Sequence, residues 1–377
     1  MKSIQWPNSI FLVGTFLLSL ITVPIYIWHF GLSPFQISLF LAFFVTTGLS
    51  ITAGYHRLFS HLTYQAAWPV RLFTLLFGAA AFENSVLCWA ADHRRHHKFV
   101  DHDEDPYNIS KGFFHAHIGW MLHKSEIPTT FEGVKDLQQD TLIRFQHRYY
   151  LPIAIGICFL LPAFIGWLWG GWSVALGGFL IAGVARVVFV NHMTFLINSL
   201  SHTWGRQTYS NRCTARDNAV LAWLTFGEGY HNFHHAFQYD YRNGVKAWHF
   251  DPTKWCIWLL HKVALAKRLR RVSPEKILLA EVAEQERAIA AKLSARPAAV
   301  SEPMLRLIQK AHLRLQQASV EWDERKAAYR AAAQQKMDAS REKIAELRQN
   351  CRVATARLRW AMRHWRAVRR LVNVRLA

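Results

Sequence analysis

Four apolar runs stand out in the first two thirds of the chain. From Ser3 to His56 there is no Lys, Arg, Asp or Glu, and this stretch holds two of the runs, residues 10–30 and 35–53, joined by GLSP. A second pair, residues 151–169 and 172–195, is joined by GGW. Each run supplies about the 20 residues that a helix needs to cross a bilayer. The pattern therefore predicts an all-α integral membrane protein with two transmembrane hairpins, and so four spans.

Charged residues set the expected orientation of these spans. Neither hairpin turn carries a charge, whereas the opposite side of the membrane is flanked by basic residues, namely Arg57, Arg71, Arg94, Arg95 and Lys98. Cytoplasmic loops of membrane proteins carry the excess of Lys and Arg. We therefore expect a multi-pass protein with its histidine-rich segments and both termini in the cytoplasm.

Two further segments combine apolar and polar residues. Residues 70–90 contain Arg71, Glu83 and Asn84, which predicts a helix at the membrane interface or packed on the cytoplasmic domain rather than a span. Arg186 lies inside the fourth apolar run. Such a residue either faces protein or marks the true end of the membrane helix, and the sequence leaves both interpretations open.

Three histidine clusters, HRLFSH, HRRHH and HNFHH, flank the apolar segments. Helical residues at offsets of 0, 3 and 4 fall within an arc of about 100°, so each of the last two clusters is expected to point its imidazoles toward one place. A lone histidine is more often an ordinary surface or core residue, but eight clustered histidines predict a metal centre. Eight is also more ligands than one metal ion needs. The predicted ligands of two metal ions are His56, His61, His93, His96, His97, His231, His234 and His235.

The segment NSLSH adds two further candidate ligands. His202 is the ninth histidine, and Asn198 lies one helical turn before it, from where it could reach a metal directly or through water. Imidazole ligands suit iron, zinc or copper. The remaining nearby histidines lack a partner cluster and are left out of the predicted set; these are His102, His115, His117, His123, His192 and His249.

Residues 1–262 resemble the membrane fatty acid desaturases, and within them the acyl-CoA Δ9 desaturases related to stearoyl-CoA desaturase. The resemblance rests on GYHRLFSH, WAADHRRHHKFVDHDEDPYN, KGFFHAHIGW, NSLSH and GEGYHNFHHAFQYDY, in that order. It implies four membrane helices under a cytosolic helical cap and two iron ions held by the nine histidines, with Asn198 linked through water. The implied reaction is the O2-dependent insertion of a cis double bond, at Δ9, into a saturated fatty acyl thioester. A related hydroxylase or acetylenase, or a membrane-anchored interaction protein on a degenerate scaffold, remains an alternative.

The resemblance also suggests which residues contact the substrate. Asn84 and Trp89 match positions near the thioester, and Thr194 matches a position at the bend of the acyl chain. Phe40 and Phe44 on the second span are expected to form the floor of the tunnel. Ala91, beside Asp92, stands where animal relatives commonly have arginine, while Lys124 retains a basic group. Fatty acyl-CoA is therefore the expected substrate, and another acyl carrier stays open.

Carboxylates around the clusters and an outside electron source complete the expected site. Six acidic residues are candidates for orienting ligand imidazoles, or else form a solvated acidic turn: Asp92, Asp101, Asp103, Glu104, Asp105 and Glu228. No FAD, nicotinamide or haem-binding fingerprint is evident in the sequence. Electrons are therefore expected from another protein, such as a ferredoxin, a rubredoxin-like protein or a cytochrome b5.

Residues 263–377 differ in character and are predicted to form a separate basic helical tail. The chain has a formal charge of +20, and from residue 265 onward 26 Lys and Arg stand against 11 Asp and Glu. In SPEK, residues 273–276, a serine N-cap and a proline at the first helical position predict a helix start. The helix should break near Pro297, and a second helix should begin around SEP, residues 301–303.

Heptad spacing within the second tail helix predicts a coiled-coil seam. One row comprises Met337, Ile344, Cys351, Leu358, Trp365 and Val372, and the other comprises Ser340, Leu347, Ala354, Ala361 and Val368. The tail could pack on itself, form a homo-oligomer with a copy, or bind membrane lipid, since nine arginines and no acid follow Glu346. A basic stripe alone is weak support for nucleic-acid binding, so no nucleic-acid partner is expected.

Overall fold

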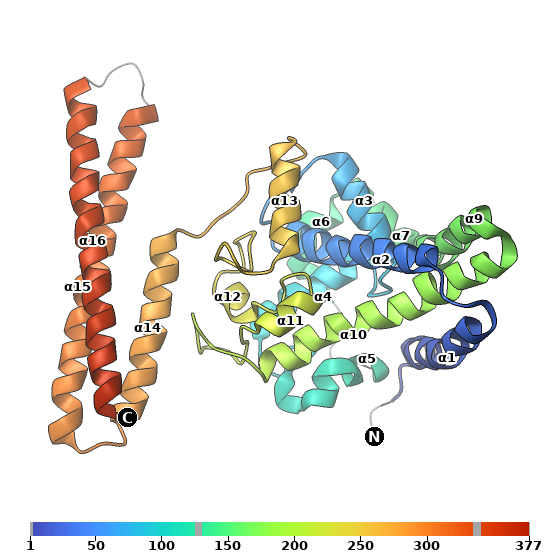
Figure 1. Cartoon of the computed structure of the whole chain (residues 1–377), viewed down its shortest axis with the longest axis horizontal. Coiled ribbons are helices and arrows are strands. Elements are labelled where there is room, and N and C mark those ends of the chain that lie inside the picture. The colour runs from blue at the N-terminus through green and yellow to red at the C-terminus, as the bar shows by residue number, and fades with distance from the viewer. Residues whose placement is uncertain (1–2, 125–129, 335–340, 377) are drawn as a thin grey trace. The chain divides into compact units, whose positions relative to one another are not determined.

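The computed structural model describes residues 3–124, 130–334 and 341–376. Its helices, including π- and 3-10 segments (η), are α1 (Trp6–Phe30), α2 (Pro34–Leu49), η1 (Ser50–Ser60), α3 (Trp68–Ala79), α4 (Val86–Phe99), η2 (Ile109–Lys111), η3 (His115–Gly119), α5 (Trp120–Leu122), η4 (Glu132–Val134), α6 (Lys135–Gln138), α7 (Thr141–Arg148), α8 (Tyr150–Ile155), η5 (Gly156–Leu160), α9 (Leu161–Gly177), η6 (Gly178–Ala185), α10 (Arg186–Ser199), η7 (Leu200–His202), α11 (Ala219–Leu224), α12 (His231–Ala236), α13 (Pro252–Lys262), α14 (Pro274–Leu293), α15 (Ala298–Gln334) and α16 (Arg341–Leu376). Two short strands, β1 (Gln65–Ala66) and β2 (Ala266–Lys267), pair antiparallel. The described part of the chain is thus mostly helical, as predicted (Figure 1).

The chain divides into two compact units. The first comprises Met1–Gln207 and Asn211–Arg271, and the second comprises Thr208–Ser210 and Val272–Ala377. The first unit contains all the apolar runs and histidine clusters, and the second contains α14, α15 and α16.

Within the described residues, three helical stretches are long and apolar enough to cross a membrane: Trp6–Phe30, Pro34–Ser60 and Tyr150–His202. The first two correspond to the first two predicted spans. The third stretch, of 53 residues, contains both remaining runs. It is interrupted at Gly170 and Gly171, where φ is −158° and 73°, and the ribbon turns back on itself within α9 (Figure 1).

Glycines allow the two arms of this third stretch to approach closely. A Cβ atom at Gly166 would lie 2.4 Å from the carbonyl oxygen of Val174, and one at Gly178 would lie 2.2 Å from that of Pro162. No side chain fits at such distances, so these positions let backbone pack on backbone. Membrane helices commonly use small residues in this way.

Arg186 faces protein, which is one of the two interpretations left open by the sequence. Its guanidinium is buried and donates to the carbonyl oxygens of Ala182 and Ala80, at 3.2 and 2.8 Å, and to Cys158 Sγ at 3.0 Å. The helix continues beyond it to Ser199. Arg186 therefore ties α10 to η5 and to the turn after α3.

Residues 70–90 form two helices with a tight turn between them, which corrects the prediction of a single helix. α3 ends at Ala79 and α4 begins at Val86, where the Ser85 side chain accepts a hydrogen bond from the amide of Cys88. Phe82 and Asn84 have φ values of 57° and 80°, in the left-handed region that side chains usually avoid. This turn directs Glu83, which lies between them, toward the interior of the unit.

In the second unit, α14 begins where SPEK predicted it. Ser273 caps the helix, Pro274 is its first residue, and the chain leaves the helical conformation between Leu293 and Ala298, next to Pro297. The expected single helix from 301 onward is wrong: α15 and α16 are two antiparallel helices lying side by side (Figure 1). Met337 and Ser340 of the predicted seam lie outside the described residues.

The part of the predicted apolar stripe from Ala354 onward is buried within this unit, whereas Ile344, Leu347 and Cys351 are half-buried. On α16 it comprises Ala354, Leu358, Ala361, Trp365, Val368 and Val372. All of these side chains except Ala354 form one core with Ile308 and Leu315 of α15 and with Val282 and Ile289 of α14. The stripe thus holds three helices of the same chain together.

Candidate metal centre and adjoining cavity

Three helical segments and one helix end carry the nine predicted histidine ligands. His56 lies on η1 and His61 directly follows it, while α4 carries His93, His96 and His97. His202 ends the stretch formed by α10 and η7, and α12 carries His231, His234 and His235. All nine are buried or half-buried. Segments that are far apart in the sequence therefore meet at one place.

The nine histidines form two groups, one of five and one of four. The first group is His56, His61, His93, His97 and His234, and the second is His96, His202, His231 and His235. Within each group every residue offers a ligand atom, and these atoms lie within 4.8 Å of one another. The whole predicted histidine set is thus brought together.

Each HxxHH cluster is divided between the two groups, so the prediction that it points all three rings to one place is wrong. On α4, His93 and His97 belong to the first group and His96 to the second; on α12, His231 and His235 belong to the second group and His234 to the first. The physical reason is helix geometry. Relative to residue i, residue i+4 is rotated by about +40° and residue i+3 by about −60°, so the i+3 ring turns the other way.

The Nε2 atoms turn toward one another in both groups. In the first group, His56 and His234 Nε2 are 3.0 Å apart, and His61 and His93 Nε2 are 2.8 Å apart. In the second group the corresponding distances are 3.3 Å between His96 and His235, 3.1 Å between His202 and His231, and 3.1 Å between His231 and His235.

Carboxylates contact the outward nitrogens of two of these imidazoles. His96 Nδ1 lies 2.9 Å from Asp105 Oδ2, and His56 Nδ1 lies 2.8 Å from Glu228 Oε2. A carboxylate at Nδ1 keeps the proton there and leaves a lone pair on Nε2. Lone pairs that converge at 3 Å repel one another unless a cation lies between them. The donor set therefore fits metal ions.

The surroundings also keep the rings in the form that binds metals. Burial, and then the neighbouring imidazoles, lower the pKa of His93, His97 and His234 well below the usual range. Neutral imidazole is the form that coordinates metals, so these rings are ready to bind at neutral pH.

The six acidic candidates have different positions. Asp105 and Glu228 contact ligand rings directly, whereas Asp101 accepts from the Thr214 hydroxyl, which lies 2.7 Å from His202 Nδ1. Asp103 and Glu104 are exposed, as expected for a solvated turn, and Asp92 lines the cavity described below.

A buried ionic network holds Glu228 in place. Arg57 donates to Glu228 Oε1 at 2.8 Å, to Asp251 Oδ1 at 3.0 Å and to the carbonyl oxygen of Tyr241 at 2.8 Å. Burial opposes ionisation of Glu228, but Arg57 and His56 outweigh it and lower the pKa of its carboxyl. The carboxylate that orients His56 therefore stays charged.

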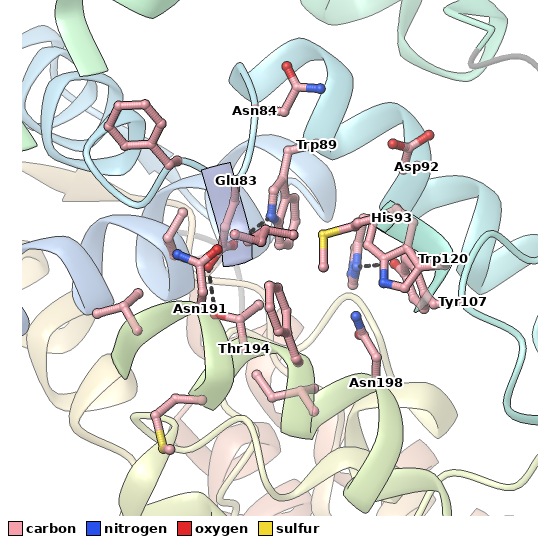
Figure 2. Close-up of a pocket in the computed structure, with 18 of the residues that line it drawn as sticks. Glu83, Asn84, Trp89, Asp92, His93, Tyr107, Trp120, Asn191, Thr194 and Asn198 are labelled. Carbon is pink, nitrogen blue, oxygen red and sulfur yellow. Dashed lines mark hydrogen bonds between the residues drawn. The ribbon is translucent and has the colours of Figure 1, made fainter. Parts of the chain in front are cut away.

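A cavity of about 720 Å³ adjoins the histidines. Its lining includes four of the ligand histidines and seven other predicted residues, namely His56, His93, His96, His231, Asn84, Trp89, Asp92, Lys124, Thr194, Asn198 and Phe44. Phe40 is not among the lining residues; its ring stacks on that of Phe44, with 6.3 Å between the ring centres. Most of the predicted substrate contacts and the metal centre thus share one cavity (Figure 2).

Glu83 is a cavity residue to which the sequence analysis gave no role. Its carboxyl accepts from the Trp89 indole N–H at 3.1 Å and from the Thr194 hydroxyl at 2.7 Å (Figure 2). Burial raises the pKa of this carboxyl to about 7, although both hydrogen bonds oppose the shift. An acid inside the largely apolar segment FGAAAFENSVL was the available signal.

His192 and His117 form a pair of their own outside both groups. His117 Nε2 lies 3.1 Å from His192 Nδ1, and His117 Nδ1 lies 3.0 Å from the Ser199 hydroxyl. Neither residue belongs to either histidine group.

Comparison with known proteins assigns the family. The family model for fatty acid desaturases matches residues 32–255. A probable acyl-CoA desaturase of Schizosaccharomyces pombe is 43% identical over 252 residues, which cover 66% of this chain and 52% of the relative. Acyl-CoA desaturase 1 of Saccharomyces cerevisiae is 39% identical over 314 residues, covering 80% and 59%. Stearoyl-CoA desaturase 2 of Rattus norvegicus is 38% identical over 241 residues, covering 63% and 67%.

The chain spans only about half to three fifths of the length of the two yeast relatives. The match nevertheless extends over more than half of this chain and includes all the histidine clusters. The chain belongs to the fatty acid desaturase family.

Proposed function

We propose that this chain is an O2-dependent desaturase that introduces a cis double bond, at Δ9, into a saturated fatty acyl-CoA. The observation that carries the proposal is a histidine-lined metal centre opening into a cavity whose other walls are largely apolar. The names of the similar proteins, acyl-CoA and stearoyl-CoA desaturase, support this substrate class.

Two iron ions are the proposed cofactor, one for each histidine group. His56, His61, His93, His97 and His234 would hold one ion, and the remaining four histidines, with Asn198 through water, would hold the other. Bound iron would supply the activation of O2, which no side chain can perform. The overall reaction removes a hydrogen from each of two adjacent methylenes, and O2 is reduced to water with electrons and protons from outside.

The protein would choose the reacting carbons by fixing the acyl chain relative to the metal centre. Neighbouring methylenes are chemically alike, so position decides which bond forms. Trp89 and Thr194, joined through Glu83, would shape the wall beside the reacting carbons. Asn84 and Lys124 line the same cavity and would face the thioester and its carrier.

Aromatic residues would close the far end of the cavity. Phe44 and Phe226 have ring centres 5.1 Å apart, and both line the cavity beside Gly48. A Cβ atom at Gly48 would lie 2.3 Å from Phe226 Cε2. No side chain at position 48 therefore fits beside the Phe226 ring. These rings would limit the length of the acyl chain.

We also infer four membrane spans with the metal centre and both termini in the cytoplasm. The chain reversal at Gly170 and Gly171 within an apolar stretch of 53 residues supports a second hairpin, and the positive-inside bias supports the orientation. The electron donor would be a separate ferredoxin, rubredoxin-like protein or cytochrome b5.

Expression in a host that lacks its own desaturase tests the function. Mass spectrometry of the fatty acids should detect a new cis Δ9 double bond with the intact chain and none with His234→Ala, which removes a predicted ligand. Hydroxylated or acetylenic products would assign the alternative oxidation instead. If the intact chain inserts into membranes but carries no metal and makes no product, the enzyme assignment is wrong and the interaction scaffold is correct.

A further inference from the structure

The outer side of α16 carries a continuous row of arginines. Arg348, Arg352, Arg359, Arg363, Arg366 and Arg370 are all exposed. They recur at intervals of three, four and seven residues, which confines them to an arc of about 60° on a helix. No acidic residue follows Glu346 on this helix, so the positive charge of the row is not offset along α16.

Exposed apolar side chains form a second row beside the arginines. Val353, Trp360, Leu371 and Val374 are 42%, 52%, 46% and 76% exposed. On the same helical projection this row also spans about 60° and lies next to the arginine row. Arg357 and Arg375 flank it on its other side, and both are exposed, although Arg357 is paired with Glu321 of α15 at 2.7 Å. The outer face of α16 is therefore an apolar row with arginines along both edges.

The core of the second unit does not account for these apolar residues. The opposite side of α16 already packs on α14 and α15 through Leu358, Trp365 and Val372. A second copy would present the same arginines and would be repelled. Nucleic acid would match the charge but would leave the apolar row exposed to water.

A lipid surface satisfies both rows at once. Anionic headgroups pair with guanidinium groups, while Trp and aliphatic side chains enter the boundary between headgroups and acyl chains. The chain also carries its own membrane helices, which keep the second unit at high local concentration near a bilayer. We propose that the outer face of α16 binds the anionic surface of a lipid bilayer.

Hydroxyl-radical footprinting of the full-length chain in nanodiscs tests this proposal residue by residue. Oxidation of Trp360 should be severalfold slower in nanodiscs that contain phosphatidylglycerol than in phosphatidylcholine alone, and high salt should reverse part of the effect. Leu313 on α15 is the internal control, because it is 57% exposed and belongs to the same unit. Its oxidation should not change. Equal rates for Trp360 in both lipids, or equal protection of Leu313, would overturn the proposal.

Matched charge variants distinguish binding through the outer face of α16 from attraction by the net charge of the second unit. The triple variant Arg352→Gln, Arg359→Gln, Arg363→Gln should lose the protection of Trp360. The control, Lys310→Gln, Arg314→Gln, Arg325→Gln, removes three exposed cations from α15 and should retain it. If Trp360 lost its protection in both triple variants, the second unit would be attracted to the anionic bilayer by its net charge and not through a defined face. Protection of Trp360 by a DNA duplex or an acidic protein, but not by phosphatidylglycerol, would assign the face to that partner. Either result would refute the proposal.

Discussion

Glu83 shows how one side chain can join two walls of the cavity. It lies between residues with left-handed φ values, and its two oxygens accept from side chains on α4 and α10. An amide could accept from Trp89 in the same way and could still bind the Thr194 hydroxyl. The two hydrogen bonds at this position therefore require a planar polar group, but they do not require that the group be charged.

We expect Glu83→Gln to retain activity and to be more stable than wild type at alkaline pH. The carboxyl pKa is raised from 4.5 to about 7 in the folded chain. Between these values the unfolded chain ionises first, so the free energy of unfolding falls as pH rises, by at most about 3 kcal/mol.

Thermal unfolding of the purified proteins from pH 5 to 8.5 measures this difference. The advantage of Glu83→Gln should grow with pH and level off above 7. Glu104→Gln, which changes an exposed acid, should show no such trend. Glu83→Ala should lose most of its activity, because it leaves Trp89 and Thr194 without their common partner. A pH-independent advantage of Glu83→Gln would contradict the argument.

His96 and His192 are a matched pair for testing ligand identity. Both are histidines near the cavity, but His96 belongs to the second metal group and His192 pairs with His117. Since even residues that only support ligands alter metal affinity or activity by about 10–100-fold, His96→Ala should cost at least as much in activity and lower the metal content. His192→Ala should retain both. Metal analysis together with product yield checks this, and normal turnover of His96→Ala would remove it from the site.

At the residue level, spacing predicted which histidines lie together better than it predicted how they are arranged. Six of the nine histidines could be selected from the sequence because clusters at offsets of 3 and 4 rarely arise from packing alone, whereas His56, His61 and His202 lie outside such clusters. How they divide could not be predicted, since it depends on where α4 and α12 lie in relation to each other. Glu83 was passed over for a similar reason: its partners Trp89 and Thr194 lie 6 and 111 residues away.

Among the elements, α2 is the one that should set chain-length selectivity. Phe44 lines the cavity and contacts Phe226, whereas Phe40 stacks on Phe44 and is not a lining residue. Phe44→Ala should shift the product profile toward longer acyl chains, by about fivefold per added methylene, because each buried methylene is worth about 1 kcal/mol.

Gas chromatography of the unsaturated fatty acids measures this shift. Phe40→Ala is the matched control and should have a smaller effect. Gly48→Ala should act in the opposite direction or lower yield, because its added methyl group would displace the Phe226 ring. An unchanged profile in both phenylalanine variants would refute this location of the cavity floor.

Local chemistry predicted where several helices begin but not where all of them end. The apolar runs and the Ser273–Pro274 cap each indicate a helix from local sequence alone. The structure has apolar helices over those runs, and α14 begins directly after Ser273. Residues 331–346 contain no glycine or proline, so nothing local indicated that α15 and α16 are separate. That arrangement follows from the shared core, in which an antiparallel pair covers the apolar stripe of α16.

At the level of the whole molecule, the second unit should be dispensable for the reaction. All nine histidines and every cavity-lining residue lie in the first unit. Deleting residues 275–377 leaves β2 paired with β1 and should preserve metal content and the double-bond position, which metal analysis and mass spectrometry would measure. A truncated chain that inserts and binds metal normally yet makes no product would show that the tail delivers electrons or substrate.

The distribution of ligands along the chain also bears on when the centre can assemble during biosynthesis. Four of the five histidines of the first group, His56, His61, His93 and His97, are synthesised before residue 100, whereas the second group then has only His96. Both groups wait for α12 to complete them. A chain whose synthesis stops between residue 100 and His202 would hold four of the five histidines of the first group but only one histidine of the second group. Loading of both proposed metal sites can therefore occur only after the apolar stretch Tyr150–His202 and α12 have been synthesised, which makes it a late step in the biosynthesis of the chain.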